Sequence, residues 1–114
     1  MGVKEKRPWG SFEVLSESSR FKVKVLEVMP GKRLSYQRHG RRDERWTVVE
    51  GIATVVLDDE ESEYTEGDVV MIERMRKHRV ENRGKEVLRI VEVQIGDYFG
   101  EDDIERFQDD YGRS

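Results

Sequence analysis

Residues 31–51 read GKRLSYQRHGRRDERWTVVEG, and a glycine at each end encloses Gln37, His39 and Glu44. On a β-strand, Gln37 and His39 would project from the same face because they are two residues apart. Glu44 comes five residues after His39, across an expected bend, and the strand-like run WTVV begins at Trp46. The stretch therefore predicts polar side chains that converge from neighbouring parts of a β structure.

A second glycine-led stretch lies further along the chain. Ten residues separate Gly67 from His78, and three more separate His78 from Asn82. In a closed barrel such hairpins can meet at one mouth, where three or four N and O donors would suit Zn, Mn, Fe, Ni or Co without choosing among them. Two histidines and a glutamine are more often ordinary polar residues, so it is the joint spacing of both stretches that favours a metal site.

Short apolar or alternating runs continue outward from these stretches. They are rich in Val and Ile, and turns containing Gly, Pro or Asp separate them closely. This pattern predicts an all-β antiparallel sandwich or small barrel. Within residues 21–28 the apolar positions change phase at Leu26, which predicts a bulge or a strand buried on both faces. The runs are FEVL, FKVKVLEV, WTVV, IATVVL, YTEGDVVMI, HRVEN and VLRIVEV.

Length and composition limit the alternatives. A chain of 114 residues has room for one domain, and a net charge of -4 with interleaved signs gives no reason to expect nucleic-acid or anionic-membrane binding. The absence of cysteine excludes thiolate ligands and disulfides. The N-terminal MGVKEKRPWG lacks an apolar signal core, and no stretch approaches the roughly 20 apolar residues of a membrane helix. We therefore expect a cytoplasmic protein without a membrane segment.

The two ends of the chain are expected to differ from the barrel between them. Residues 1–11 are predicted to form an N-terminal arm, with Trp9 packing on the barrel surface, and residues 12–95 to form the barrel. Residues 96–114 are predicted to form a helical tail, because the acidic residues near Gly100 suit the first turn of a helix. Such a short helix would carry Ile104 and Phe107 inward.

The two spaced stretches resemble the paired cupin motifs, with Gln37 at the position of the first histidine of that family. The resemblance implies a double-stranded β-helix, a jelly-roll-like barrel, over the whole of residues 1–114. A closer resemblance, to the C-terminal domain of bifunctional mannose-6-phosphate isomerase/mannose-1-phosphate guanylyltransferases, covers almost the whole chain. It is carried by RPWGSFEVL, PGKRLSYQ, the Trp and Gly of ERWTVVEG, IVEVQIGDY and GEDDIERFQDDYGR.

This resemblance implies one divalent metal ion held by the residues Gln37, His39, Glu44 and His78. Zinc is the leading choice, with Mn, Fe, Ni and Co open. It also implies a sugar phosphate as ligand, a place in carbohydrate metabolism and polysaccharide biosynthesis, and pairing of two copies as a homodimer.

Two departures from the family pattern concern the site. Where the family has a histidine-rich run before the acidic ligand, this chain reads HGRRDER over residues 39–45. The Pro-x-Gly turn expected before the second histidine is replaced by Glu73-Arg74-Met75. The loop over the site is therefore expected to differ in shape, while the ligands stay intact.

Basic residues flank both stretches and predict a positive mouth that attracts anions. The alternative is that they are solvated strand ends that balance the acidic turn at residues 58–61 and the acidic C-terminus. Three of the chain's basic residues are candidates for contact with a sugar phosphate: Arg42, Lys77 and, if the tail folds over the mouth, Arg113. The flanking residues are Arg38, Arg41, Arg42, Arg45, Arg74, Arg76, Lys77, Arg79 and Arg83.

The leading hypothesis is a metal-dependent mannose-6-phosphate isomerase. In it the metal acts as a Lewis acid, and Arg42 is catalytic by pairing with phosphate or enediolate oxygens. The base that moves the proton is left open. Two alternatives remain, namely another metal-dependent cupin enzyme and a non-catalytic metal- or sugar-binding module that acts with a separate nucleotidyltransferase chain. The altered histidine run and the missing transferase part of the sequence favour the module.

Overall fold

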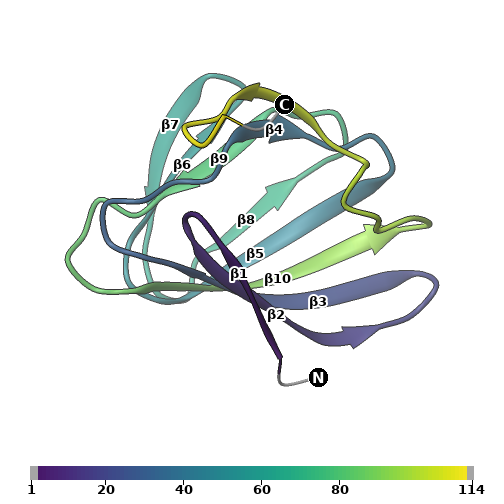
Figure 1. Cartoon of the computed structure of the whole chain (residues 1–114), viewed down its shortest axis with the longest axis horizontal. Helices are drawn as coiled ribbons and strands as arrows, with labels where there is room; N and C mark the ends of the chain where they lie inside the picture. Colours follow the sequence, from purple (N-terminus) through teal and green to yellow (C-terminus); the bar gives the residue numbers. More distant parts are fainter. Residues whose placement is uncertain (1–2, 113–114) are drawn as a thin grey trace.

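Two antiparallel β-sheets face each other in the computed structural model, which describes residues 3–112 (Figure 1). The six-stranded sheet runs β1 (Lys4–Arg7), β2 (Gly10–Glu17), β3 (Phe21–Val28), β10 (Leu88–Gly96), β5 (Arg42–Glu50) and β8 (Val69–Ile72). The five-stranded sheet runs β11 (Glu105–Gln108), β4 (Tyr36–Arg38), β9 (His78–Glu81), β6 (Ala53–Leu57) and β7 (Glu60–Tyr64). The all-β prediction is confirmed. The described residues form no helix that could cross a membrane.

The space between the sheets is apolar at one end and polar at the other. On β5 the inward positions pass from Val48 and Trp46 to Glu44 and Arg42, all buried. The inward positions of β10 follow the same order, and the register pairs Val48 with Ile90, Trp46 with Glu92 and Glu44 with Gln94. Because strand side chains alternate between faces, each strand supplies both the core and the polar end. The inward residues of β10 are Leu88, Ile90, Glu92 and Gln94.

The phase change expected in residues 21–28 has a simple origin. The inward residues of β3 are Lys24, Leu26 and Val28, while Val23 and Val25 are half-buried on the opposite face. A lysine thus takes an inward position in an otherwise regular strand. The irregularity in register lies in the neighbouring β2.

The helix predicted for the C-terminal tail is wrong. Residues 105–108 are extended and pair with β4, which also pairs with β9 on its other side. The three-residue β4 gains backbone partners on both edges in this way, and those bonds would be lost if the tail coiled into a helix. Phe107 packs on Tyr36 with ring centroids 6.2 Å apart and stays 38% exposed, so it does not form the buried helical stripe that was expected.

The N-terminal segment is more closely integrated than expected. Trp9 was predicted to lie on the barrel surface, but it is buried within the core. The β1–β2 hairpin places it there, with Arg7 paired to Gly10. At Gly10, where φ is 153°, a Cβ atom would lie 1.9 Å from the backbone oxygen of Glu27, so only glycine allows this close approach of β2 to β3.

Asn82, which closes the second sequence stretch, ties three backbone segments together. Its Nδ2 donates to the carbonyl oxygens of Val28 and Glu86, each at 2.8 Å, and its Oδ1 accepts from the Gly84 amide at 3.0 Å. Asn82→Ala should lower the free energy of unfolding by about 2–4 kcal/mol, because buried carbonyls would lose their donors. Urea denaturation measures the change. Ser62→Ala, at an exposed position on β7, serves as the control, and equal stability of the two variants would contradict this role.

Candidate metal centre

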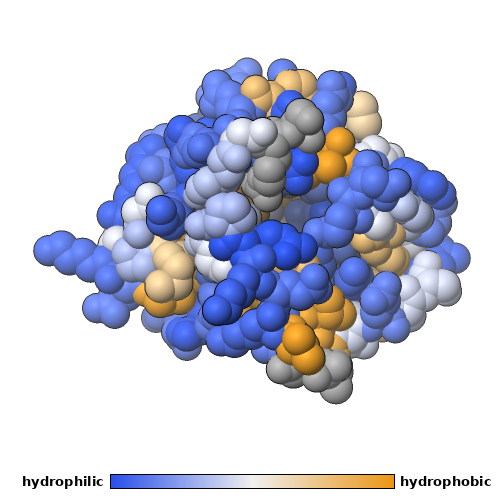
Figure 2. Space-filling view, viewed as in Figure 1, coloured by the Kyte–Doolittle hydropathy of each residue, from blue (hydrophilic) through white to orange (hydrophobic). Residues whose placement is uncertain are grey.

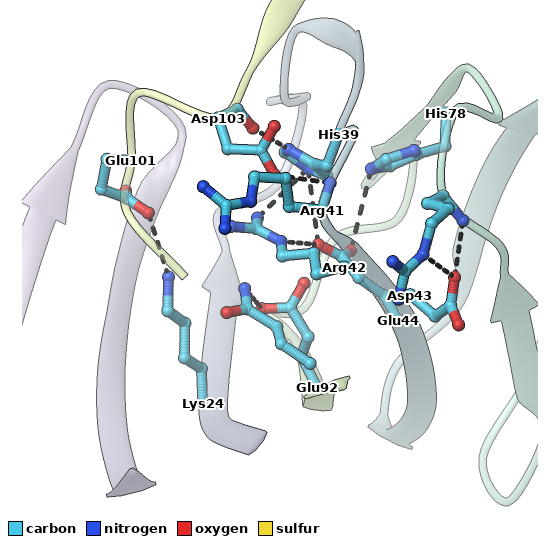
Figure 3. A network of polar contacts seen from close by, with 12 residues as sticks. Lys24, His39, Arg41, Arg42, Asp43, Glu44, His78, Glu92, Glu101 and Asp103 are labelled. Atoms are coloured by element: carbon cyan, nitrogen blue, oxygen red, sulfur yellow. Dashed lines mark hydrogen bonds and ion pairs between the residues drawn. The ribbon is translucent and has the colours of Figure 1, made fainter. Parts of the chain in front are cut away.

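Three of the four predicted ligands meet at the polar end of the barrel. His39 follows β4, Glu44 lies on β5 and His78 begins β9, and one ligand atom from each lies within 4.8 Å of the others. His39 Nε2 is 3.4 Å from Glu44 Oε2, and His78 Nε2 is 3.7 Å from Glu44 Oε1. All three side chains are buried. The carboxylate therefore lies between two imidazole rings that come from the opposite sheet (Figure 3).

The hydrogen bonds of the two rings fix which nitrogen is available to a metal. His39 Nδ1 is 2.7 Å from the carbonyl oxygen of Asp103, and His78 Nδ1 is 3.0 Å from that of Arg76. A carbonyl oxygen only accepts, so each Nδ1 carries the proton and each Nε2 presents a lone pair. Both lone pairs are on the side of Glu44. The donor set of two imidazoles and a carboxylate therefore fits a divalent ion.

The fourth predicted ligand, Gln37, is buried on β4 and lines the same cavity. In the register of the sheet it is the direct partner of His78. Its amide oxygen is thus placed on the correct strand for a fourth ligand, and its coordination stays a prediction.

Arg42 occupies the centre of the site rather than its rim. Its Nε donates to Glu44 Oε2 at 2.8 Å, and its Nη2 lies 3.2 Å from His39 Nε2. Arg42 is 6% exposed, and its Nη1 has no hydrogen-bond partner among the described residues. The guanidinium therefore touches the same two atoms that a metal ion would use and balances the charge of Glu44.

A second buried carboxylate, Glu92, lies beside the first and was not anticipated from the sequence. Trp46 Nε1 donates to Glu44 Oε1 at 3.0 Å and to Glu92 Oε2 at 3.1 Å, and Gln94 Nε2 donates to Glu92 Oε1 at 3.0 Å. The signal was present in the run VLRIVEVQ, because Glu92 and Gln94 continue the inward alternation that begins at Leu88.

The surroundings separate the protonation of these groups. Burial alone would raise the pKa of Glu44, but electrostatic attraction to His78, Arg42 and His39 outweighs it and holds that pKa well below its usual range. Burial raises the pKa of Glu92 to about 8, and repulsion from Glu44 adds to the shift. Burial lowers the pKa of His39 to about 4 and also lowers the pKa of His78. Near neutral pH the site therefore offers neutral imidazoles and one carboxylate, with a proton on Glu92.

The remaining predicted site residues do not converge on this centre. Lys77 is absent from the cavity lining, and its Nζ lies 4.4 Å from the centroid of the Phe107 ring. Arg113 lies outside the described residues. Several flanking arginines are paired with carboxylates, as expected of strand ends that balance acidic segments. These pairs are Arg38 with Glu105, Arg41 with Asp97, Arg74 with Asp43, Arg76 with Asp58 and Arg83 with Glu61.

A barrel of two facing antiparallel sheets with a buried His/Glu/His group at one end defines the cupin class. The solved structures agree. A protein with a double-stranded β-helix domain from Klebsiella pneumoniae superimposes with a TM-score of 0.80 at 20% identity, covering 93% of this chain and 85% of that one. KdgF from a Halomonas species gives 0.76 at 17% identity, covering 88% and 89%. At these identities the likeness shows the fold alone.

Residues 1–109 match the family described as "Mannose-6-phosphate isomerase C-terminal", and the chain belongs to this family. The alginate biosynthesis protein AlgA of Pseudomonas aeruginosa is 49% identical, over 95% of this chain and 22% of its own length. The xanthan biosynthesis protein XanB of Xanthomonas campestris is 46% identical, over 95% and 23%. A mannose-1-phosphate guanylyltransferase of Salmonella montevideo is 43% identical, over 95% and 23%.

These relatives correct the leading functional hypothesis. The chain spans less than a quarter of each curated relative, and the names of the relatives refer to polysaccharide biosynthesis or to guanylyltransferase activity. The relatives thus include enzymes, but none of these findings assigns isomerase activity to this segment by itself. A stand-alone mannose-6-phosphate isomerase was therefore the wrong choice, and the findings favour the alternative of a cupin module.

The raised pKa of Glu92 predicts a pH-dependent stability in the metal-free protein. The folded protein keeps a proton that the unfolded chain releases above its usual pKa of 4.5, so this stabilisation is fully present below pH 4.5 and is lost as the pH rises through about 8. In Glu92→Gln the loss should disappear. Over this range the unfolding free energy of the variant, relative to wild type, should rise by more than about 1 kcal/mol.

Urea unfolding in the presence of a chelator, repeated across this pH range, measures the difference. Glu63→Gln changes an exposed carboxyl on β7 in the same way and provides the control. Parallel stability curves for wild type and Glu92→Gln would show that Glu92 releases its proton at an ordinary pH.

Proposed function

We propose that this chain is a cupin module that binds a divalent metal ion and a sugar phosphate, and that it acts together with a nucleotidyltransferase. The observation that supports this most directly is the buried Glu44 between two imidazole Nε2 atoms, with Arg42 Nη1 left without a partner among the described residues. Two neutral nitrogen ligands and a carboxylate attract a cation, and an unpaired guanidinium nitrogen attracts an anion.

The metal would be held by His39, Glu44 and His78, with Gln37 as the fourth ligand. Zinc remains the leading choice for this set of N and O donors, and Mn, Fe, Ni and Co remain alternatives. A bound ion would supply a Lewis acid that draws a sugar oxygen towards the polar end of the barrel. The carbonyl groups of Asp103 and Arg76 keep the two rings in the orientation that the ion needs.

The ligand and the partner are inferred from the family. Its description names mannose 6-phosphate, and the matching segment of the Salmonella montevideo protein belongs to a mannose-1-phosphate guanylyltransferase. A nucleotidyltransferase that handles a mannose phosphate and a module that binds one would share a substrate class. This common chemistry supports a partnership between the two.

Pairing of two copies also stays a prediction, and the outer face of the six-stranded sheet is the surface that suits it. Apolar side chains from β3, β8 and β10 lie on this face, including Val69 at 52% and Met71 at 55% exposure. The register places Met71 beside Arg45 and Val69 beside Thr47, so polar side chains of β5 border the apolar positions of β8 on this face.

Metal loading is the first test of the proposal. We expect wild-type protein to bind one equivalent of zinc, and His78→Ala to bind it at least 100-fold more weakly, because one of three close ligands is lost. Calorimetry with zinc gives both affinities, and mannose 6-phosphate should bind the loaded protein more tightly than the chelated protein. Replacement of an exposed residue, Lys32→Ala, is the control. Equal zinc affinity of wild type and His78→Ala would contradict the centre.

Arg42 should affect metal and sugar phosphate in opposite directions. Its guanidinium contacts Glu44 and His39, so Arg42→Met should tighten zinc binding by roughly tenfold through removal of a competing positive charge. The same variant should weaken mannose 6-phosphate binding by roughly tenfold through loss of a charge-assisted hydrogen bond. Calorimetry on the same preparations measures both affinities. If both affinities rise or both fall, Arg42 either does not compete with the metal or does not bind the sugar phosphate.

A further inference from the structure

A lysine lies inside the barrel at the polar end, where the metal centre does not use it. Lys24 is on β3 and is 4% exposed, and its Nζ is 4.2 Å from the centroid of the Phe12 ring. Lysine is almost never fully buried without a partner, because desolvation of an ammonium group is costly. The carboxylate paired with it is that of Glu101, at 3.4 Å.

The Glu101 carboxylate comes from the tail segment that crosses this end of the barrel (Figure 3). Its side chain is 58% exposed, whereas that of Lys24 is 5% exposed. Ion pairs with a largely exposed partner at such a distance contribute little to stability. The cation is thus fixed in the interior, while solvent reaches the anion, so Glu101 can turn away when another anion takes its place beside Lys24.

A second cation faces the same carboxylate. Arg7, on β1, has its Nη2 3.8 Å from Glu101 Oε1, and its Cζ lies 4.7 Å from the centroid of the Phe12 ring. Lys24 and Arg7 therefore both pack against the ring of Phe12, and both approach the single carboxylate of Glu101. These residues line the same cavity as Arg42.

Arg42 connects this group to the metal centre. Its charge acts on Glu101. Burial alone would raise the pKa of that carboxyl, but Lys24, Arg42 and Arg7 together hold this pKa below its usual range. Its buried Nη1 has no hydrogen-bond partner among the described residues. Two cations thus lie close to one exposed carboxylate, and a third, which lines the same cavity, still has a donor without a partner among the described residues.

We infer that Lys24, Arg7 and Arg42 form an anion subsite for the phosphate of a phosphorylated sugar, and that the Glu101 carboxylate occupies this subsite until the ligand displaces it. The inference rests on the proposed function, because the sugar would extend from this subsite towards the metal centre. A phosphate monoester carries more charge than a carboxylate and has three acceptor oxygens, so it can serve three cations where Glu101 serves two.

The tail can release Glu101 without leaving the barrel. Asp103 accepts from the backbone amides of Gly40 and Arg41, each at 3.0 Å, and its carbonyl oxygen pairs with His39 Nδ1. These bonds anchor the tail two residues beyond Glu101. Exchange of Glu101 for phosphate therefore needs a rotation of one exposed side chain. Figure 2 shows mainly hydrophilic residues around the hollow on this face.

Calorimetry with inorganic phosphate, mannose 6-phosphate and mannose, on the zinc-loaded protein, tests the subsite. Glu101→Gln should tighten the binding of both phosphates by roughly three- to tenfold, because it removes the competing charge. Lys24→Met should weaken the binding of both by roughly tenfold or more, since it removes a charge-assisted contact. Neither variant should change mannose binding by more than about twofold, because mannose carries no charge.

Two matched controls accompany these variants. Glu63→Gln and Lys85→Met make the same chemical changes at exposed positions and should leave phosphate affinity unchanged. The subsite is disproved if Glu101→Gln binds phosphate as wild type does. Because Glu101 is exposed, this variant tests the idea even if Lys24→Met fails to fold. Unchanged mannose 6-phosphate binding in both variants, with zinc binding intact, would overturn the subsite alone, whereas loss of zinc and sugar-phosphate binding in the wild type would overturn the proposed function.

Discussion

The buried carboxylate of Glu44 is the group on which the rest of the polar interior depends. An isolated carboxylate in this position would cost several kcal/mol, and hydrogen bonds from two side chains offset that cost here. Arg42 and Trp46 donate to its two oxygens, and the imidazoles of His39 and His78 lie on either side. Each partner needs its own support from another strand or from the tail. The anchoring of one charge therefore organises both sheets at this end.

The register of β5 and β10 explains why this charge can be buried without loss of the core. Both strands turn apolar side chains inward at one end and polar ones at the other, and the pairing of Val48 with Ile90 and of Glu44 with Gln94 keeps like with like. The interior is thus divided along the strands. Hydrophobic burial at one end stabilises the barrel, which leaves the other end free to hold charges whose chief value is chemical.

Sequence reasoning succeeded where local pattern and tertiary structure agree. The period of two in the Val- and Ile-rich runs predicted strands, and the glycine-bounded spacing predicted that His39, Glu44 and His78 meet before their strands could be paired. It failed where a short polar segment was compatible with more than one secondary structure. The acidic residues near Gly100 suit a helix start, but they form a turn, and the chain extends from residue 105 because β4 requires a backbone partner. The preference of four residues cannot outweigh a row of sheet hydrogen bonds.

Lys24 and Glu92 were missed for a related reason. Charged residues on a strand are ordinarily assigned to the solvent side, and the inward positions of Lys24 and Glu92 become certain only when β3, β10 and β5 are placed side by side. In this arrangement Glu92 is buried beside Glu44 and keeps its proton near neutral pH. Lys24 pairs with the carboxylate of Glu101, which lies 77 residues away in the sequence.

The tail joins these parts through one short segment. Asp103 fixes the proton of His39 through its carbonyl oxygen, and Glu101, two residues earlier, balances Lys24. A change at either end of this segment is thus transmitted through backbone that is bonded to residues 40 and 41, next to Arg42. The orientation of His39, a proposed metal ligand, and the charge at the proposed anion subsite therefore depend on the same few residues. Extended pairing with β4 holds them in place in a way that a free helix at the end of the chain would not.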